Sequence, residues 1–453
     1  MKKIKLLLCL FMLTTLCGCS NSNKNASSKT LNAAMFWIST SLDPTNNYDG
    51  WVLSRIGVGE TLLKLNEKYE VEPCLAKSYE QIDDTTWKLT LKDSITFSNG
   101  KKVTGENVKA CLERAFEKNT RAIDYFDLNH VEAKGQDIYL YLNKPSGAIL
   151  NNLCEPLFTI YDASQSEEDI AHHPLCTGPF VVDDFVSEKT IDTSKNKKYY
   201  DGKAKLDHVH FSQVADSDAR VLALQSGEVD LANTIDYSSL KLFRNNKDYQ
   251  VLEVLGPRTN VIYMNNETTF LSDLTIRKAL SYSVNRKSIV KLIGGKEATG
   301  LYSSALPYGD VSNGYSLNLK EANRLLDEAG YVDTNNDGIR EKDGQEIILN
   351  YYESADHGSA DANIIAQSMQ SEAKKIGIKI CYYSLLLFYA FNSPKTPKSA
   401  KLTIAGALGY LILPIDLIPD FIPVVGFADD AAVIISALYR VVSHIDGPMK
   451  LKA

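Results

Sequence analysis

The fold is decided by residues 87–115, WKLTLKDSITFSNGKKVTGENVKACLERA. Apolar and polar side chains alternate over Trp87–Leu91, and this period of two predicts a half-buried β-strand. Asn99-Gly100 is a strong signal for a tight turn. Thr104 then stands where a helix N-cap is expected, and apolar residues recur at helical spacing over Val108–Ala115. A strand, a turn and a capped helix in succession predict a mixed α/β chain.

The same two patterns recur later in the chain. Apolar residues at positions 138, 140 and 142 alternate with others, which predicts a further strand. Asn318 and Glu321 have the spacing of a capping box, and a helical apolar pattern follows as far as Ala329. Gly330 stands where that helix is expected to end.

The bulk composition is that of a globular protein. The 453 residues are 44% hydrophobic and 23% charged, and a chain of this length suits about three domains. The formal net charge of −7 argues against a nucleic-acid partner, because a phosphate-binding face needs an excess of basic residues.

No motif in the sequence asks for catalysis, a cofactor or a metal. The chain has no Gly-x-Ser-x-Gly elbow, His-Glu-x-x-His helix or phosphate-binding loop, so we expect no enzyme, and in particular no hydrolase. Residues 333–338 mimic the start of a calcium loop, but the twelfth position is Gly344 and not a bidentate acid. His172-His173 and His208-x-His210 lack a third ligand nearby in the sequence. We expect a turn and a solvated strand face instead.

Residues 1–19 resemble a bacterial lipoprotein signal peptide. A basic start precedes an apolar run over Leu6–Leu16, which is shorter than the roughly 20 residues that span a bilayer. The run ends in Leu16-Cys17-Gly18-Cys19, similar to a lipobox, which implies lipidation of Cys19; an ordinary secretory signal is the alternative. Polar residues 20–30 then suit a flexible tether. We expect a lipid-anchored protein on the extracytoplasmic face of the cell membrane.

Five cysteines follow Cys19, and an odd number defines no disulfide framework. They are Cys74, Cys111, Cys154, Cys176 and Cys381. Export permits disulfides, with Cys154 and Cys176 the nearest pair in sequence. Isolated buried cysteines that act as small apolar side chains are the alternative.

Seven short motifs resemble those of one known family and occur in the same order as in that family. They are Leu42-Asp43-Pro44, residues 72–78 (EPCLAKS), 97–100 (FSNG), 177–180 (TGPF), 223–230 (ALQSGEVD), 276–286 (IRKALSYSVNR) and 325–331 (LLDEAGY), the last running into 337–344 (DGIREKDG). Together they resemble the family 5 extracellular solute-binding proteins, the receptors for oligopeptides, dipeptides, opines and nickel chelates.

This resemblance implies a two-lobed α/β fold of the periplasmic-binding-protein type. We expect the first lobe over residues 31–256 and the second over residues 257–380. In this family the lobes close over a ligand at their hinge and present a closed surface to the membrane permease. The implied partners are the permease subunits of an ABC importer and a peptide or metal-chelate ligand.

The resemblance also implies ligand-binding residues. Residues 97–109 and 119–128 look closest to the nickel-chelate receptors, whose site carries an aromatic residue and a nearby arginine in the second segment. Tyr125 takes the aromatic place here and Arg121 lies one turn before it. Arginine suits a ligand carboxylate because its planar fork donates two parallel hydrogen bonds. Tyr48 and Trp51 are further candidates, and packing is the alternative role for all four.

Composition changes abruptly after Ile380, and the rest of the chain resembles a second family. Residues 413–423 (LPIDLIPDFIP) and 426–430 (GFADD) are similar to the YkvA-like domain of unknown function. Prolines break helices and aspartates are costly in lipid. We therefore expect a small helical, membrane-associated domain over residues 381–453 and not one spanning helix.

The junction near residue 380 interrupts the second lobe. Family 5 receptors continue well past this point, so we expect an incomplete second lobe with exposed edges and apolar surface. A real gene fusion, a truncated product and two genes joined in error are three explanations. The alternative function is a membrane-associated YkvA-like protein that carries a non-functional receptor remnant.

Overall fold

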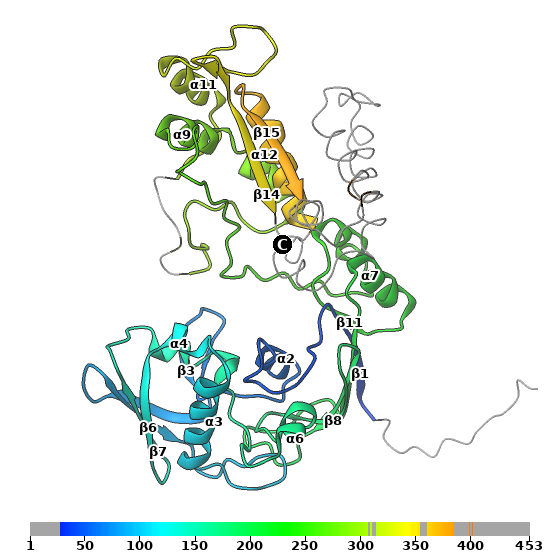
Figure 1. Cartoon of the computed structure of the whole chain (residues 1–453). Helices are drawn as coiled ribbons and strands as arrows, with labels where there is room; N and C mark the ends of the chain where they lie inside the picture. The colour runs from blue at the N-terminus through cyan, green and yellow to red at the C-terminus, as the bar shows by residue number, and fades with distance from the viewer. Residues whose placement is uncertain are drawn as a thin grey trace, which may run out of the picture. The chain divides into compact units, whose positions relative to one another are not determined.

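The computed structural model describes residues 28–306, 309, 314–353, 360–384, 398 and 401. The chain folds into two compact units, Met1–Ile235 and Asp236–Ala453, and each is described by itself (Figure 1). The units divide earlier than the lobe boundary expected at residue 256. That boundary, and the predicted bounds of the signal peptide, tether and tail, stay predictions; the lipobox with Cys19 lies outside the described residues.

The first unit contains a five-stranded mixed sheet. Its strand order is β11-β1-β10-β9-β8. These strands are β1 (Thr30–Met35), β8 (Phe180–Val186), β9 (Thr190–Lys195), β10 (His208–Gln213) and β11 (Leu231–Ala232). β1 pairs in parallel with β10 and β11, whereas the other pairs are antiparallel. The parallel pairs join segments far apart in the sequence, so this sheet ties the start of the unit to its end.

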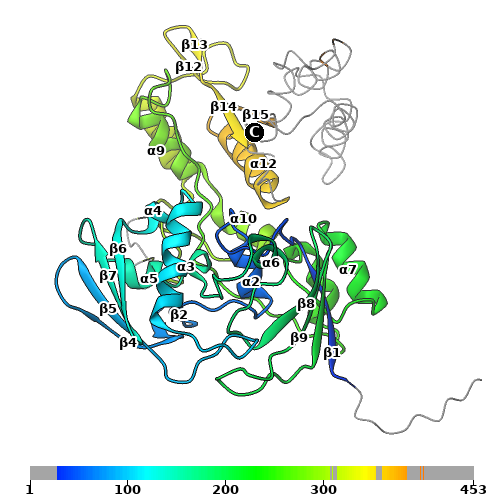
Figure 2. The ribbon, with the colours of Figure 1, turned by 60° about the horizontal axis from the view of Figure 1, so that its bottom comes forward.

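A second, antiparallel sheet carries the predicted strands. Its order is β4-β5-β7-β6, with bounds Ala76–Gln81 for β4, Thr86–Leu91 for β5, Leu128–Lys134 for β6 and Asp137–Leu142 for β7. Leu89, Leu91, Ile138, Leu140 and Leu142 are buried, as the alternation predicts. α3 (Gly105–Lys118) packs on β6 and β7 (Figure 2).

The predicted turn and cap join these elements. Gly100 has a positive φ of 92°, and its N–H donates to the carbonyl of Phe97. The Thr104 hydroxyl accepts from the Asn107 N–H, while the Asn107 side chain accepts from the Thr104 N–H, which closes a capping box at the start of α3. The sequence predictions for residues 87–115 are therefore confirmed.

Short elements complete the first unit. They are α2 (Gly50–Arg55), β2 (Leu63–Leu65), β3 (Val71–Pro73), α4 (Ala122–Tyr125), α5 (Ile149–Asn152), the 3-10 turn η1 (Pro156–Phe158), α6 (Glu167–His172) and α7 (Ser217–Ser226). β2 and β3 form a two-stranded antiparallel ladder, and α2 lies against η1.

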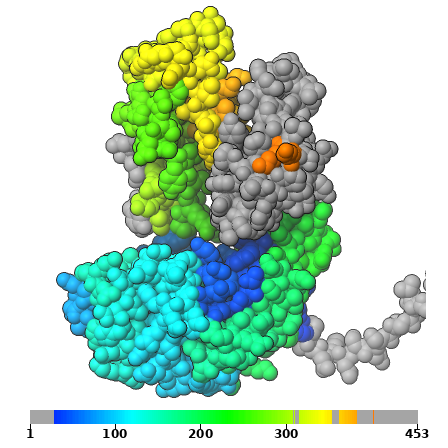
Figure 3. All heavy atoms as spheres, viewed as in Figure 1, coloured from blue at the N-terminus to red at the C-terminus, as the bar shows by residue number. Residues whose placement is uncertain are grey.

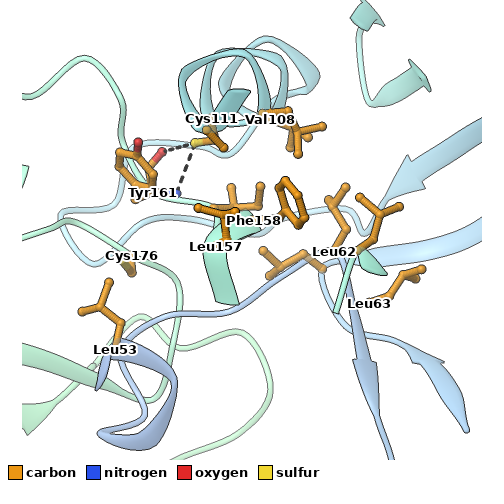
Figure 4. Close-up of a cluster of buried hydrophobic side chains, with 14 of the residues drawn as sticks. Leu53, Leu62, Leu63, Val108, Cys111, Leu157, Phe158, Tyr161 and Cys176 are labelled. Carbon is orange, nitrogen blue, oxygen red and sulfur yellow. Dashed lines mark hydrogen bonds between the residues drawn. The ribbon is translucent and has the colours of Figure 1, made fainter. Parts of the chain in front are cut away.

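Most of the apolar core of this unit is one cluster of buried side chains, and Ala34, Ala223 and Val229 form a second, smaller cluster. Figure 4 shows part of the larger cluster, in which Leu62, Val108 and Phe158 come from segments far apart in the sequence. The Cys111 thiol donates to the Tyr161 carbonyl at 3.1 Å and accepts from the Tyr161 N–H at 3.4 Å. On the face seen in Figure 3, side chains of the first unit, blue to green, form an unbroken surface.

The five cysteines named above are free in the structure. Cys74, Cys111 and Cys176 are buried, and burial raises the pKa of the Cys111 thiol to about 12 and that of Cys74 to about 11. Thiolates are the reactive form, and these thiols stay protonated at neutral pH. The buried cysteines therefore act as small apolar side chains, which was the alternative to disulfides in the sequence analysis.

The motif at residues 177–180 has a packing role in the first unit. A Cβ on Gly178 would lie 2.5 Å from the Gly57 carbonyl oxygen and 2.6 Å from that of Val58. The Thr177 hydroxyl donates to the Glu60 carboxylate at 2.7 Å. The backbone at Gly178 can approach the backbone of Gly57 and Val58 only because residue 178 has no side chain.

The second unit has its own core. Its elements are η2 (Tyr237–Ser239), α8 (Lys241–Arg244), α9 (Leu274–Ser283), α10 (Arg286–Ile293), α11 (Leu319–Glu328), β12 (Glu341–Lys342), β13 (Gln345–Glu346), β14 (Ile348–Glu353), α12 (Ala360–Lys374) and β15 (Lys379–Ser384). Asn318 caps α11 by accepting from the Glu321 N–H, and Gly330 follows its end with a φ of 81°, as predicted. The predicted capping box is only half formed, because the Asn318 N–H donates to the Tyr282 carbonyl and the Glu321 side chain pairs with Arg324. β14 and β15 pair in parallel.

Two features of the second unit bear on the predicted junction. β15 runs through residue 380, where the composition changes. Residues 251–264 form no strand, and Leu252, Val254 and Tyr263 are 79%, 86% and 89% exposed. The incomplete second lobe stays a prediction.

We predict that Gly178→Ala lowers the free energy of unfolding of the first unit by about 2 kcal/mol, because two backbone carbonyls must move to admit the methyl group. Denaturant unfolding followed by tryptophan fluorescence measures this, since all three tryptophans, Trp37, Trp51 and Trp87, lie in the first unit. The control is Gly147→Ala, whose Cβ meets nothing within 4 Å and is expected to change stability by less than about 0.5 kcal/mol. Equal effects of the two variants would contradict the close-approach argument.

Candidate functional site

The candidate site lies in the first unit, where the loop after β1 meets the end of α3. The loop is anchored by a buried ion pair: Arg114 Nη2 lies 2.6 Å from Asp43 Oδ2, and Arg114 Nη1 lies 2.9 Å from Asp43 Oδ1. Arg114 also donates to the hydroxyls of Thr45 and Tyr161. Both charged side chains are nearly buried, with exposures of 11% and 12%. The motif Leu42-Asp43-Pro44 thus contains the carboxylate that fixes the loop to α3.

This ion pair governs the protonation of Asp43. Burial by itself raises the pKa of a carboxyl group. Here the hydrogen bonds from Arg114 and Thr45 outweigh burial and hold the pKa of Asp43 below its ordinary value. Asp43 therefore stays charged and bound to Arg114 across the neutral range.

Asn119, at the end of α3, connects the anchored loop to the candidate site through hydrogen bonds of its side chain. Its amide nitrogen donates to the carbonyls of Thr45 and Asn47, each at 3.1 Å. Its side-chain oxygen accepts from the Arg121 N–H at 2.9 Å. Asn119 is 7% exposed, so it is a buried amide with both ends satisfied. It holds the loop and the start of α4 in one arrangement.

Arg121 lies at the centre of the candidate site. Its guanidinium carbon lies 3.7 Å from the centroid of the Tyr48 ring, which is close cation–π stacking. Nη1 donates to the Asn47 carbonyl at 2.8 Å, and Nη2 donates to the Tyr125 hydroxyl at 2.6 Å. The guanidinium plane is thus held on one side by an aromatic ring and at its edge by two oxygens.

Trp51 joins the cluster through Glu155. The indole N–H of Trp51 donates to Glu155 Oε1 at 2.9 Å, and Arg121 Nη2 lies 3.7 Å from the same oxygen. Gly50 permits this approach, because a Cβ there would lie 2.4 Å from the Pro156 carbonyl oxygen. α2 can therefore lie directly against the turn that carries Glu155.

The exposures show which parts of the cluster face solvent. The Tyr48 and Trp51 residues are 55% and 38% exposed, whereas the side chains of Arg121 and Glu155 are 26% and 13% exposed. Burial, followed by the nearby Glu155 carboxylate, raises the pKa of the Tyr125 phenol to about 12. Tyr125 is therefore a neutral hydrogen-bonding group at physiological pH.

The structure brings all four predicted site residues together. Tyr48, Trp51, Arg121 and Tyr125 form one arginine–aromatic cluster, and their binding role stays a proposal. Glu155 and Asn119 were missed by sequence reasoning. Glu155 is 104 residues from Trp51 in the chain, and no local pattern marks it. Asn119 is the first residue of the segment 119–128, which resembles the nickel-chelate receptors, so it could have been chosen as a candidate from the sequence.

The segments whose sequences suggested metal sites form a hydrogen-bonded turn and a strand pair instead. Within residues 333–338, the Gly338 N–H donates to Asp333 Oδ2 and the Asp337 N–H to Asn335 Oδ1, which makes a hydrogen-bonded turn. His210 Nδ1 lies 2.7 Å from Asp192 Oδ1 on the neighbouring strand. Across the described ranges, no group of three or more histidine, cysteine or acidic side chains is arranged to hold a metal ion. In the same ranges, no helix has the length and apolar character needed to cross a bilayer.

The fold places the chain in a structural class. NikA from Staphylococcus aureus in complex with Ni(L-His)2 has a similar structure, with a TM-score of 0.61 and 24% identity over 90% of this chain and 91% of that one. This likeness shows an α/β fold of the periplasmic-binding-protein type, as predicted.

The family follows from the sequence comparisons. Residues 70–392 match the family described as bacterial extracellular solute-binding proteins, family 5 Middle, and residues 400–435 match a protein family of unknown function, DUF1232. The chain belongs to the family 5 extracellular solute-binding proteins and carries a C-terminal DUF1232 (YkvA-like) region. Members of this family are substrate-binding receptors of ABC transporters and not enzymes.

Two relatives show how much of a family member the chain matches. The nickel-binding protein NikA of Staphylococcus aureus is 31% identical over 368 residues, which are 81% of this chain and 71% of that protein. The oligopeptide-binding protein AppA of Bacillus subtilis is 28% identical over 343 residues, which are 70% of this chain and 62% of AppA. The chain thus spans less than two thirds of AppA.

The carboxyl group of Asp49, next to Tyr48, provides a pH test of the loop. Burial raises the pKa of Asp49 to about 6, so the folded state holds this proton more tightly than the unfolded state. The contribution to stability is fully present below about pH 4 and is lost as the pH rises through 6. We predict that Asp49→Asn removes this loss and raises the free energy of unfolding near pH 7.5 by about 2 kcal/mol.

Urea unfolding followed by tryptophan fluorescence at several pH values between about 4 and 7.5 measures the effect. Asp84→Asn is the matched control, since Asp84 is exposed and lies on a loop away from Asp49 in the sequence. If Asp49→Asn and the wild-type chain lose stability in parallel over this range, the raised pKa is wrong.

Proposed function

We propose that this chain is the lipid-anchored, extracytoplasmic ligand-binding receptor of an ABC importer for peptides or nickel chelates. Ligand-induced lobe closure, as the family resemblance implies, would present the loaded receptor to the permease subunits. The observation that supports the proposal most directly is the arginine–aromatic cluster of Tyr48, Trp51, Arg121 and Tyr125.

The chemistry of the cluster suits both ligand classes. Peptides and amino-acid chelates of nickel both carry carboxylates, and the guanidinium of Arg121 can donate to a carboxylate from a fixed plane. The exposed rings of Tyr48 and Trp51 offer apolar faces to a peptide side chain or an imidazole. Since the Tyr48 ring and two oxygens already hold Arg121, little side-chain entropy is lost when a ligand binds.

The membrane connections belong to the same proposal. Lipid on Cys19 would anchor the receptor, residues 20–30 would act as the tether, and the YkvA-like region at residues 381–453 would add a second membrane contact. These segments lie largely outside the described residues, so the support for them comes from the sequence patterns.

Ligand binding tests the proposal directly. We predict that the full-length chain, purified in detergent, shows an upward shift in its tryptophan-monitored unfolding midpoint with either Ni(L-His)2 or a mixture of short peptides. A ligand that binds only the folded state at 100 times its Kd stabilises it by about 2.7 kcal/mol. Arg121→Gln should weaken binding at least ~10-fold, because a charged hydrogen bond to the ligand carboxylate is lost.

Lys109→Gln serves as the matched control, since this half-buried lysine on α3 pairs only with Glu113 among the described residues. The substitution is expected to leave affinity unchanged. Absence of any shift with both ligand types would refute the receptor function and favour the alternative of a receptor remnant joined to a membrane-associated domain.

A further inference from the structure

Glu155 places a negative charge beside the arginine of the proposed site. Its Oε1 atom lies 2.9 Å from the Trp51 indole nitrogen and 3.7 Å from Arg121 Nη2. The Glu155 side chain is only 13% exposed, so solvent screens it less than it screens a surface carboxylate. Neither the sequence nor the comparisons assign a role to this residue.

The charges of the Arg121–Glu155 pair balance each other. Arg121 contributes one positive charge and Glu155 one negative charge, while Tyr125 stays neutral because burial and Glu155 raise its pKa to about 12. Trp51 donates its N–H to the carboxylate and adds no charge. A ligand carboxylate at Arg121 therefore meets a paired charge with Glu155 beside it, while a second cation, Arg55, lies 5.6 Å from the Trp51 ring centroid.

From this geometry we propose that Glu155 is a specificity-determining residue that selects ligands with no net charge over anionic ones. The inference rests on the proposed function. A neutral nickel chelate or a zwitterionic peptide can direct a carboxylate to Arg121 while its donor groups face Glu155. An anionic ligand gains the same contact with Arg121 but is repelled by Glu155, because charges a few ångströms apart in partly buried surroundings interact strongly.

The role differs from a purely structural one in a measurable way. Glu155→Gln keeps an oxygen that can accept the Trp51 N–H and removes only the charge. A structural role would change the affinity for neutral and anionic ligands by the same factor. A charge-selecting role changes the ratio of the two affinities.

Two probe pairs measure that ratio on the full-length chain. The first pair is Ni(L-His)2, which is neutral, and nickel–EDTA, which is doubly negative. The second is trialanine and the same tripeptide with aspartate at its centre. We expect the wild-type chain to prefer the neutral member of whichever pair it binds, and Glu155→Gln to move the preference about tenfold toward the anionic member.

Companion variants guard against misfolding and long-range effects. Arg121→Gln should shift the ratio in the opposite direction, and the Arg121→Gln/Glu155→Gln double variant should return it near the wild-type value at lower affinity. Glu228→Gln removes an exposed carboxylate after α7 and should leave the ratio unchanged. Where Glu155→Gln alone folds poorly, comparing the double variant with Arg121→Gln still measures the effect of the Glu155 charge on the ratio.

The outcomes separate the inference from the function on which it rests. Binding with an equal ratio in wild-type, Glu155→Gln and double-variant chains overturns the role of Glu155 alone. A ratio that shifts as strongly in Glu228→Gln also overturns it, because the effect is then one of total charge. No binding of any probe by the wild-type chain overturns the proposed function and the inference together.

Discussion

The buried ion pair between Asp43 and Arg114 is the constraint on which the site depends. It joins the loop after β1 to α3 through two hydrogen bonds of 2.6 and 2.9 Å. Replacing Arg114 would leave the buried Asp43 carboxylate without its cation, which costs about 3–5 kcal/mol, whereas Arg114 itself also pairs with Glu167 at 2.6 Å. Asn119 then connects the anchored loop to Arg121, because its side chain bonds to the carbonyls of Thr45 and Asn47 and to the Arg121 N–H. The stacking of Arg121 on Tyr48 is possible because the loop is held at both points.

Two carboxylates of the same loop show how local surroundings set opposite protonation behaviour. Asp43 faces Arg114 and has a lowered pKa. Asp49 is at least as buried, but among the described residues its carboxylate accepts a side-chain hydrogen bond only from the Asn46 amide, at 2.6 Å, and burial raises its pKa to about 6. The first carboxylate stabilises the loop at neutral pH, whereas the second costs stability there. The loop that carries Tyr48 is thus held by one charge and weakened by another.

All residues of the arginine–aromatic cluster belong to the first unit, which has its own main apolar core. This arrangement matters for a chain in which one family match ends at residue 392 and another begins at residue 400. The second unit packs a separate core, around Ile276, Leu326 and Ile376. The hydrogen bonds described here that position the site all join residues of the first unit.

Local sequence determined the elements, and tertiary structure decided the site. The strand at Trp87–Leu91, the turn at Gly100 and the cap at Thr104 depend on residues a few positions apart, so periodicity and capping chemistry were sufficient to predict them. Arg121 and Tyr125 could be paired because they lie one helical turn apart. Glu155 could not be predicted, since its contact with Trp51 spans 104 residues and exists only because Gly50 lets two backbones approach. Long-range packing sets such contacts, and a single sequence does not record which distant segments meet.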